Sequence, residues 1–183
     1  MDNVGIVVDD LDAAVAFFTE LGMELEGKAQ VEGPSVDRTV GLDGVRCDIA
    51  MMRTPDGNGR LELAKFHTPP AVRAEPESAP ANALGIRRIM FAVDDMDAVL
   101  ARMRAHGAEL IGEMQYEGTY RLAYIRGPEG IIVALAEPVL RRDGTGMSEL
   151  PSSAAAAQRL GWSEGDAQRA FKAALTMNIS MLE

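Results

Sequence analysis

The spacing of apolar positions near the start of the chain predicts a strand followed by a helix. The β-branched run from Val4 to Val8 is typical of a strand. Apolar side chains then recur at i, i+3, i+4 and i+7, on Leu11, Ala14, Val15 and Phe18, which favours a helix with one buried face. The DDLD segment at residues 9–12 supplies an Asp N-cap and acidic residues for the first turn, and Gly22 stands where a C′ glycine ends a helix.

The same pattern returns 85 residues later. Residues 91–112 align with residues 6–27 without a gap, and 10 of the 22 positions are identical. The second copy has a strand-like run from Ile89 to Val93, a DDMD segment at residues 94–97 that supplies an Asp N-cap, and a C′ glycine at Gly107. Its apolar stripe lies on Met96, Val99, Leu100 and Met103. Agreement of this extent indicates a duplicated structural unit.

Each copy continues with further strand-like segments. They run over Val45 to Met52 and Arg60 to Phe66 in the first copy, and over Arg121 to Ile125 and Ile131 to Ala136 in the second. A Pro-Asp-Gly turn or a Pro-Glu-Gly turn precedes the last strand of each. We therefore predict an α+β chain with βαβββ modules over residues 1–68 and 85–140, joined by a Pro- and Ala-rich linker at 69–84.

Residues 141–183 are interpreted as a second linker and a helical tail. Ser152 or Ser153 can cap a short helix closed by Gly161, and a capping box at 163–166 begins a longer one. Trp162 is expected to anchor this tail. The sequence leaves two roles open, because the tail can be an appendage packed on the body or an arm that covers a partner subunit.

The duplicated segments resemble the vicinal-oxygen-chelate superfamily of glyoxalases, bleomycin-resistance proteins and dioxygenases. The resemblance rests on VGIVVDDLDAAVAFFTELGMEL, LELAKF, GIRRIMFAVDDMDAVLARMRAHGAEL and GPEGIIVALAEP, over about residues 1–139. It implies that two tandem βαβββ modules form a cupped mixed sheet, followed by the C-terminal helical extension. It does not imply one reaction, because the superfamily also includes epimerases, thiol transferases and non-catalytic antibiotic-binding proteins.

In members that use a metal, the resemblance implies four ligands, one each from the first and last strand of both modules. The corresponding positions in this chain are Asn3, Glu62, Arg88 and Ala134. Only Glu62 is a good ligand, because an amide is a weak donor, a guanidinium cannot coordinate and alanine has no donor. We therefore predict no cofactor and no metal, with a divalent metal as the alternative, and Glu62 is the only candidate catalytic residue.

The cup that the resemblance implies also suggests an ion pair between two of these four residues. Arg88 and Glu62 would point into the same space, so that an Arg88–Glu62 ion pair replaces the metal. The alternative is that Arg88 points outward and Glu62 is solvated. Neither histidine is a strong substitute ligand: His106 ends a helix, where a cation is favoured, and His67 lies an odd number of residues from Glu62 along one strand.

Tyrosines and methionines complete the candidate binding surface. Tyr120 and Tyr124 share one face of a predicted strand and suit an aromatic or sugar-like ligand, with ordinary sheet packing as the alternative. Met90 faces the cup if Arg88 does. Met51, Met52, Met90 and Met103 are otherwise expected to fill gaps in the core. The predicted ligand-binding residues are Asn3, Glu62, Arg88, Met90, Tyr120 and Tyr124.

Composition narrows the range of partners. The net charge is −10 and the pI about 4.7, so nucleic acid is a poor partner, because phosphate binding needs a basic surface. Cys47 is the only cysteine, which excludes an internal disulfide, and it is expected to be a small, half-buried apolar residue. No apolar run approaches the roughly 20 residues of a membrane helix, and acids occupy the N-terminus, so we expect no membrane partner and a cytoplasmic protein.

Three functions remain open from the sequence. The first is a small-molecule-binding protein, expected to be a homodimer, with its ligand in the cup between modules and no catalytic metal. The missing ligands favour it, as does an acidic charge that suits cationic antibiotics of the bleomycin type. The second is a metal-dependent lyase, epimerase or dioxygenase, which rests on the resemblance and Glu62. The third is a metal-free enzyme in which Arg88 orients Glu62 as a general base.

Overall fold

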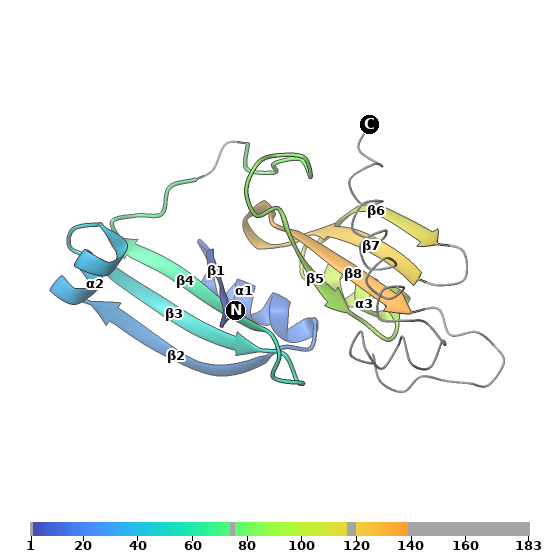
Figure 1. The fold of residues 1–183 in the computed structure, drawn as a ribbon, viewed down its shortest axis with the longest axis horizontal. Coiled ribbons are helices and arrows are strands. Elements are labelled where there is room, and N and C mark those ends of the chain that lie inside the picture. Colours follow the sequence, from blue (N-terminus) through green and yellow to red (C-terminus); the bar gives the residue numbers. More distant parts are fainter. Residues whose placement is uncertain (1, 74–75, 117–119, 139–183) are drawn as a thin grey trace, which may run out of the picture. The chain divides into compact units, whose positions relative to one another are not determined.

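The protein has two four-stranded mixed sheets, one in each module (Figure 1). The structure, a computed structural model, describes residues 2–73, 76–116 and 120–138. The first module contains β1 (Val4–Val7), α1 (Leu11–Glu20), β2 (Glu24–Glu32), α2 (Pro34–Val40), β3 (Arg46–Arg53) and β4 (Arg60–Thr68). The second contains β5 (Arg88–Ala92), α3 (Met96–Ala105), β6 (Glu109–Tyr116), β7 (Tyr120–Arg126), the 3₁₀ helix η1 (Pro128–Gly130) and β8 (Ile132–Pro138).

The strand orders β1-β4-β3-β2 and β5-β8-β7-β6 confirm the tandem βαβββ prediction. In each sheet the first and last strands of the module pair in parallel, and the remaining pairs are antiparallel. A parallel pair requires a crossover, which the rest of the module supplies. The first strand of each module therefore lies at one edge of its sheet, beside the last strand.

Local signals at the helix ends explain why the duplicated segments fold alike. The side chain of Asp10 accepts a hydrogen bond from the backbone N–H three residues later at 2.9 Å, and Asp95 does the same at 2.9 Å. Gly22 and Gly107 have φ values of +99° and +81°. Both predicted N-caps and both C′ glycines are therefore confirmed.

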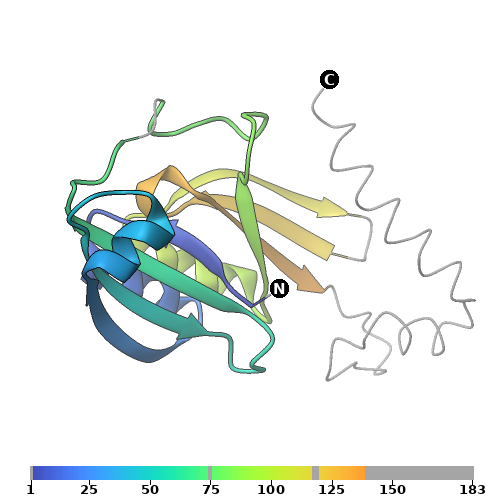
Figure 2. The same ribbon diagram turned by 60° about the vertical axis from the view of Figure 1, so that its left-hand side comes forward.

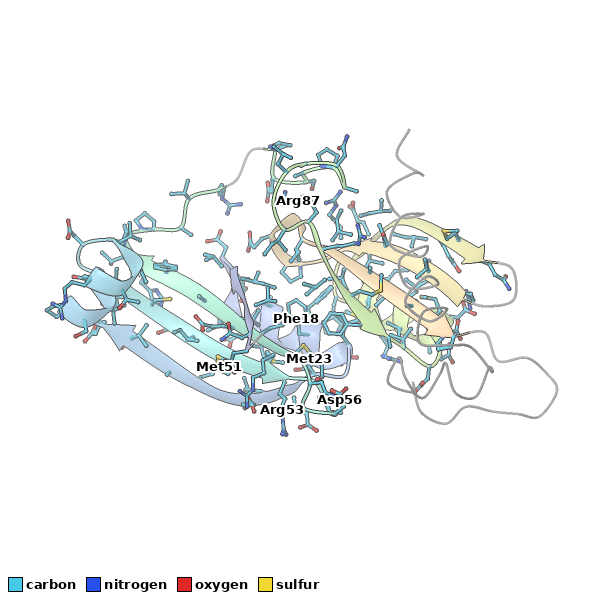
Figure 3. The ribbon with its side chains drawn as sticks, in the orientation of Figure 1. Phe18, Met23, Met51, Arg53, Asp56 and Arg87 are labelled. Atoms are coloured by element: carbon cyan, nitrogen blue, oxygen red, sulfur yellow. The ribbon has the colours of Figure 1, made fainter. Side chains whose placement is uncertain are left out.

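One apolar core joins the helix-bearing faces of the two sheets. Phe18 of α1 is fully buried, and its ring centroid lies 6.3 Å from that of Phe91 in β5 (Figure 3). The neighbouring Phe17 packs edge-on against Phe18 with a centroid distance of 5.3 Å. Gly127 makes room for it, because a Cβ at this glycine would lie 3.2 Å from the Phe17 ring. Aromatic side chains of the first module thus pack directly against the second module.

The short helix α2 was not predicted. It lies on the sheet face opposite α1 (Figure 2). Val36 of α2 packs on a second apolar cluster, which includes Val45, Cys47 and Ala64. The Asp37 carboxylate holds the following loop by accepting hydrogen bonds from two backbone N–H groups, at 3.0 and 2.8 Å. With seven residues and no buried side chain, α2 lacks the apolar stripe by which longer helices are recognised.

The segment between the modules has no helix or strand in its described residues, 69–73 and 76–84. Nη1 of Arg126 donates hydrogen bonds to the carbonyl oxygens of Ala79 at 2.8 Å and Gly130 at 2.9 Å. Gly130 has a φ of +71°, and a Cβ there would lie 2.1 Å from the Glu77 carbonyl oxygen. The linker therefore lies directly against η1.

The predicted helices of residues 141–183 and the expected anchoring by Trp162 lie outside the described residues. In the part of the chain that is described, no helix is both long enough and apolar enough to cross a membrane.

Candidate ligand-binding site

Strand register arranges the four predicted metal positions in two equivalent pairs. Gly5 lies opposite Glu62 in the parallel pair of β1 and β4, and Met90 lies opposite Ala134 in the pair of β5 and β8. Gly5 and Met90 are 85 residues apart, the same offset as the sequence repeat. The register therefore makes Ala134 the counterpart of Glu62, and the repeat makes Arg88 the counterpart of Asn3.

In the first module, Glu62 belongs to the sheet face that does not carry α1. Its neighbours Leu61 and Leu63 are buried in the core, whereas Glu62 itself is half-buried and points the other way. Oε2 of Glu62 accepts a long hydrogen bond of 3.5 Å from Nδ2 of Asn3. No cationic side chain among the described residues pairs with this carboxylate. It remains available to a donor from a ligand.

In the second module, the equivalent place holds a cation over an aromatic ring. Cζ of Arg88 lies 5.5 Å from the centroid of the Tyr124 ring, within range of a cation–π interaction. Tyr124 lies opposite Ala134, which is fully buried. Met90 is 49% exposed, so it points away from the core, and the prediction that it fills a core gap is wrong. Tyr120 begins β7, but its side chain lies outside the described residues.

The predicted Arg88–Glu62 ion pair is wrong for the single chain. Each of the two side chains instead contacts a residue of its own module, Arg88 the Tyr124 ring and Glu62 the Asn3 amide. Within residues 2–73, 76–116 and 120–138 neither forms an ion pair. The sequence could not reveal this, because the choice of partner depends on how closely the two sheets approach.

The side chains at the four positions do not fit a divalent metal. Ala134 offers no donor, and Arg88 keeps its positive charge whatever the pH. Asn3 and Glu62 remain, which falls short of the three or more protein donors that such ions require. The described residues contain no group of three or more His, Cys, Asp or Glu arranged to hold a metal. The metal content of the protein stays a prediction.

The histidines and the cysteine have other surroundings. Nε2 of His67 lies 2.8 Å from Oδ2 of Asp48, and this hydrogen bond lowers the pKa of the Asp48 carboxyl. His106 caps the C-terminus of α3, with Nε2 3.9 Å from a carboxylate oxygen of Glu20. Cys47 is more buried than expected, at 3% exposed, and burial is the main reason that the pKa of its thiol is raised.

Met51 is a site residue that the sequence interpretation missed. It lies opposite Glu62 across β3 and β4 and is half-buried, whereas the adjacent Met52 is fully buried in the core (Figure 3). Met52 and Met103 are in the core as predicted, and Met51 is not. The available signal was strand alternation, because two consecutive residues of a strand point to opposite faces. Met51 thus takes the place in the first module that Tyr124 has in the second.

Two clefts in the described part of the chain lie elsewhere. One, of about 420 Å³, is lined by Lys28, Asp48, Lys65 and His67 with the start of α1. The other, of about 330 Å³, lies between β1, the linker and η1. Neither is lined by Glu62 or Arg88, so neither coincides with the predicted cup.

Comparison with known proteins gives a consistent result. A family model described as the Glyoxalase/Bleomycin resistance protein/Dioxygenase superfamily matches residues 1–135. The uncharacterized protein YaeR of Escherichia coli (strain K12) is 28% identical over 138 residues, covering 74% of this chain and 93% of YaeR. The crystal structure of a glyoxalase family protein from Bacillus cereus is 54% identical, with a TM-score of 0.73, over 76% of this chain and 94% of that chain.

A more distant structure is a mutant of glyoxalase I from Zea mays. It is 18% identical, with a TM-score of 0.53, over 76% of this chain and 47% of the maize chain. At this identity the likeness shows the fold alone.

Proposed function

We propose, from the premise that this chain belongs to the Glyoxalase/Bleomycin resistance protein/Dioxygenase superfamily, that it binds a small organic molecule without using a divalent metal. The observation that carries the proposal is Arg88 over the Tyr124 ring, at a position where metal-using relatives of the fold need a donor. The proposed binding residues are Asn3, Glu62, Arg88, Met90, Tyr120 and Tyr124.

The chemistry of these side chains suggests the class of ligand. Arg88 presents N–H donors to a carbonyl or anionic oxygen, and the Tyr124 ring offers a flat apolar surface. The Glu62 carboxylate accepts hydrogen bonds from a hydroxyl or ammonium group. An aromatic or sugar-like molecule fits this set, and the net charge of −10 favours a cationic one, such as an antibiotic of the bleomycin type.

A metal titration separates this proposal from its alternative, a metal-dependent lyase, epimerase or dioxygenase. Protein freed of metal by a chelator is titrated with Zn²⁺, Ni²⁺, Mn²⁺ and Fe²⁺, and metal content and Tm are measured. We expect no stoichiometric metal and no saturable rise in Tm. If a metal site were present, a free metal concentration of 100 times its Kd would stabilise the fold by about 2.7 kcal/mol, which would raise the Tm. Near-stoichiometric metal that is lost in Glu62→Gln would establish the alternative.

A ligand screen tests the binding surface itself. Aromatic, sugar-like and bleomycin-type compounds are screened by thermal shift, and the Kd of each ligand found is measured by calorimetry. Arg88→Met should weaken binding by about 10-fold or more, as expected for loss of a charge-assisted hydrogen bond. Arg104→Gln is the matched control, because Arg104 is exposed on α3 and carries the same charge. Equal affinities in the two variants would contradict the proposed surface.

We further propose a cytoplasmic homodimer. Val7 and Met90, the latter also a proposed binding residue, leave apolar surface open, at 48% and 49% exposed. Light scattering coupled to size exclusion should give about twice the 19.6 kDa chain mass, and Met90→Lys should shift the equilibrium toward monomer. A monomeric mass at every concentration would exclude the dimer. Recovery of the protein with membranes in cell fractionation would exclude the location.

A further inference from the structure

Arg87 is a charged side chain that the proposed binding surface does not use. It stands between the linker and β5, one residue before Arg88, and is half-buried (Figure 3). Its Nε is shut off from solvent and has no hydrogen-bond partner. No carboxylate of the described residues forms an ion pair with its guanidinium. Buried donors are nearly always satisfied, so this one calls for an explanation.

Arg87 lines the cleft of about 330 Å³ beside the edge strand β1. The cleft is walled by Val4–Val7 of β1, by the linker and by residues 129–131, and its size is within the range of small-molecule sites. Val72 and Ile86 line it and are 96% and 72% exposed. Apolar side chains left open beside a polar rim are typical of a surface that a ligand covers.

The other charged groups that line this cleft already have partners. Arg73 pairs with both Asp9 and Glu77. Glu129 accepts a hydrogen bond of 2.7 Å from the backbone N–H of Asp9. Of the described charged residues that line the cleft, Arg87 is therefore the one whose side chain has neither a counterion nor a hydrogen-bond partner.

The backbone around Arg87 gives its guanidinium space. Gly85 has a φ of +98°, and a Cβ there would lie 3.2 Å from Nη2 of Arg87. The guanidinium therefore lies next to Gly85, where any larger residue would crowd it. The linker wall is held by the hydrogen bond of 2.8 Å from Arg126 to the Ala79 carbonyl oxygen.

We propose that this cleft binds a small monocarboxylate with an apolar body. The carboxylate pairs with Arg87 through charge-assisted hydrogen bonds, and the hydrocarbon covers Val72 and Ile86. A single negative charge is favoured over a dianion, because the carboxylates of Asp9, Glu77 and Glu129 also line the cleft and repel a higher charge. Neither Glu62 nor Arg88 takes part, so this site is independent of the proposed function.

Octanoate is the probe, and octan-1-ol is its neutral counterpart of equal chain length. Calorimetry should detect saturable octanoate binding to the full chain, at least 10-fold tighter than binding of octan-1-ol. Arg87→Gln should weaken octanoate binding at least 10-fold, whereas Arg104→Gln, with the same charge change on α3, should leave it unchanged. Arg88→Met should also leave it unchanged, which separates this site from the proposed binding surface.

NMR can locate the binding site on the protein. The methyl resonances of Val72 and Ile86 should shift on addition of octanoate. Val72→Asp serves as a second variant should Arg87→Gln fail to fold, since a residue 96% exposed tolerates substitution. The negative charge added by Val72→Asp must weaken the binding of octanoate more than the binding of octan-1-ol. The proposal is overturned by undetectable octanoate binding at millimolar concentration or by equal affinity for octanoate and octan-1-ol. It is also overturned if Arg87→Gln and Val72→Asp bind octanoate as tightly as the unaltered chain does.

Discussion

The two modules share a backbone pattern but carry opposite charges on it. In the second module, a central cation on β7, Arg121, is surrounded by carboxylates on Asp97, Glu113 and Glu137. In the first module, strand register and the repeat place an acid, Asp48, at the equivalent position of β3, and the flanking residues are Asp12, Lys28 and Lys65. Three of the four signs are inverted, and only the aspartate in the first helical turn is retained.

The ion pairs within the two clusters are also arranged differently. Arg121 contacts all three acids directly, at 2.8, 2.7 and 3.1 Å. In the first module Lys28 pairs with Asp12 at 2.5 Å. Asp48 contacts neither lysine and instead lies 2.8 Å from Nε2 of His67. The first cluster has two cations and two acids, whereas the second has one cation and three acids. Duplication has thus preserved the residues that set the backbone, whereas the surface charges of the two modules have diverged. The proposed binding faces follow the same rule, with Asn3 and Glu62 in one module and Arg88 and Tyr124 in the other.

The largest expected effect tests whether the modules depend on each other. Phe18→Ala should lower the free energy of unfolding by about 3–5 kcal/mol, because it removes a fully buried ring that packs on Phe91 of the other module. Its counterpart 85 residues later, Met103→Ala, should cost about 2–5 kcal/mol. Urea denaturation measures both. Hydrogen exchange in β5 and β8 should accelerate in Phe18→Ala, and unchanged protection there would show that the modules unfold separately.

A second comparison uses glycines with positive φ. Gly130→Ala should cost about 2 kcal/mol or more, because alanine is strained at a φ of +71° and its Cβ would overlap the Glu77 carbonyl oxygen. Gly107→Ala shares the strain at a φ of +81° but has open space around it, so about 1 kcal/mol is expected. Thermal unfolding gives both values. A smaller loss of unfolding free energy in Gly130→Ala than in Gly107→Ala would contradict the contact between the linker and η1.

The helix caps should behave alike in the two modules. Asp10→Ala and Asp95→Ala each remove one hydrogen bond of 2.9 Å to the first helical turn, so each should cost about 1 kcal/mol. Chemical denaturation of the two variants provides the measurement. A difference well above 1 kcal/mol would mean that one of these aspartates has a role outside its cap.

The smallest expected effect concerns titration of the inverted clusters. The hydrogen bond from Arg121 lowers the pKa of Asp97 below 3.8, and the hydrogen bond from His67 lowers the pKa of Asp48. Each carboxylate therefore contributes stability above pH 3.8 that is lost as the pH falls below this value. NMR titration should show that Arg121→Gln raises the pKa of Asp97 toward 3.8 and leaves Asp48 unchanged, and that His67→Leu does the reverse. Equal responses at both sites would indicate a general change of charge.

Much of the fold could be predicted because its signals are short-range. The caps, the C′ glycines and the apolar stripes act within one or two helical turns, so they can be recognised along the chain. The short helix α2 escaped prediction because none of its side chains is buried. Met51 escaped because two adjacent methionines were both assigned to the core, although a strand buries one and turns the other outward.

The sequence by itself determined the repeat, the two βαβββ modules and the poor set of metal ligands at residues 3, 62, 88 and 134. The tertiary structure decided which side chains meet. It placed Arg88 on Tyr124 rather than on Glu62, and it left Arg87 without a counterion in a cleft that Val72 and Ile86 also line. The reason is that caps and periodicity depend on neighbours along the chain, whereas the energy of a charged contact depends on a distance across strands that no local pattern records.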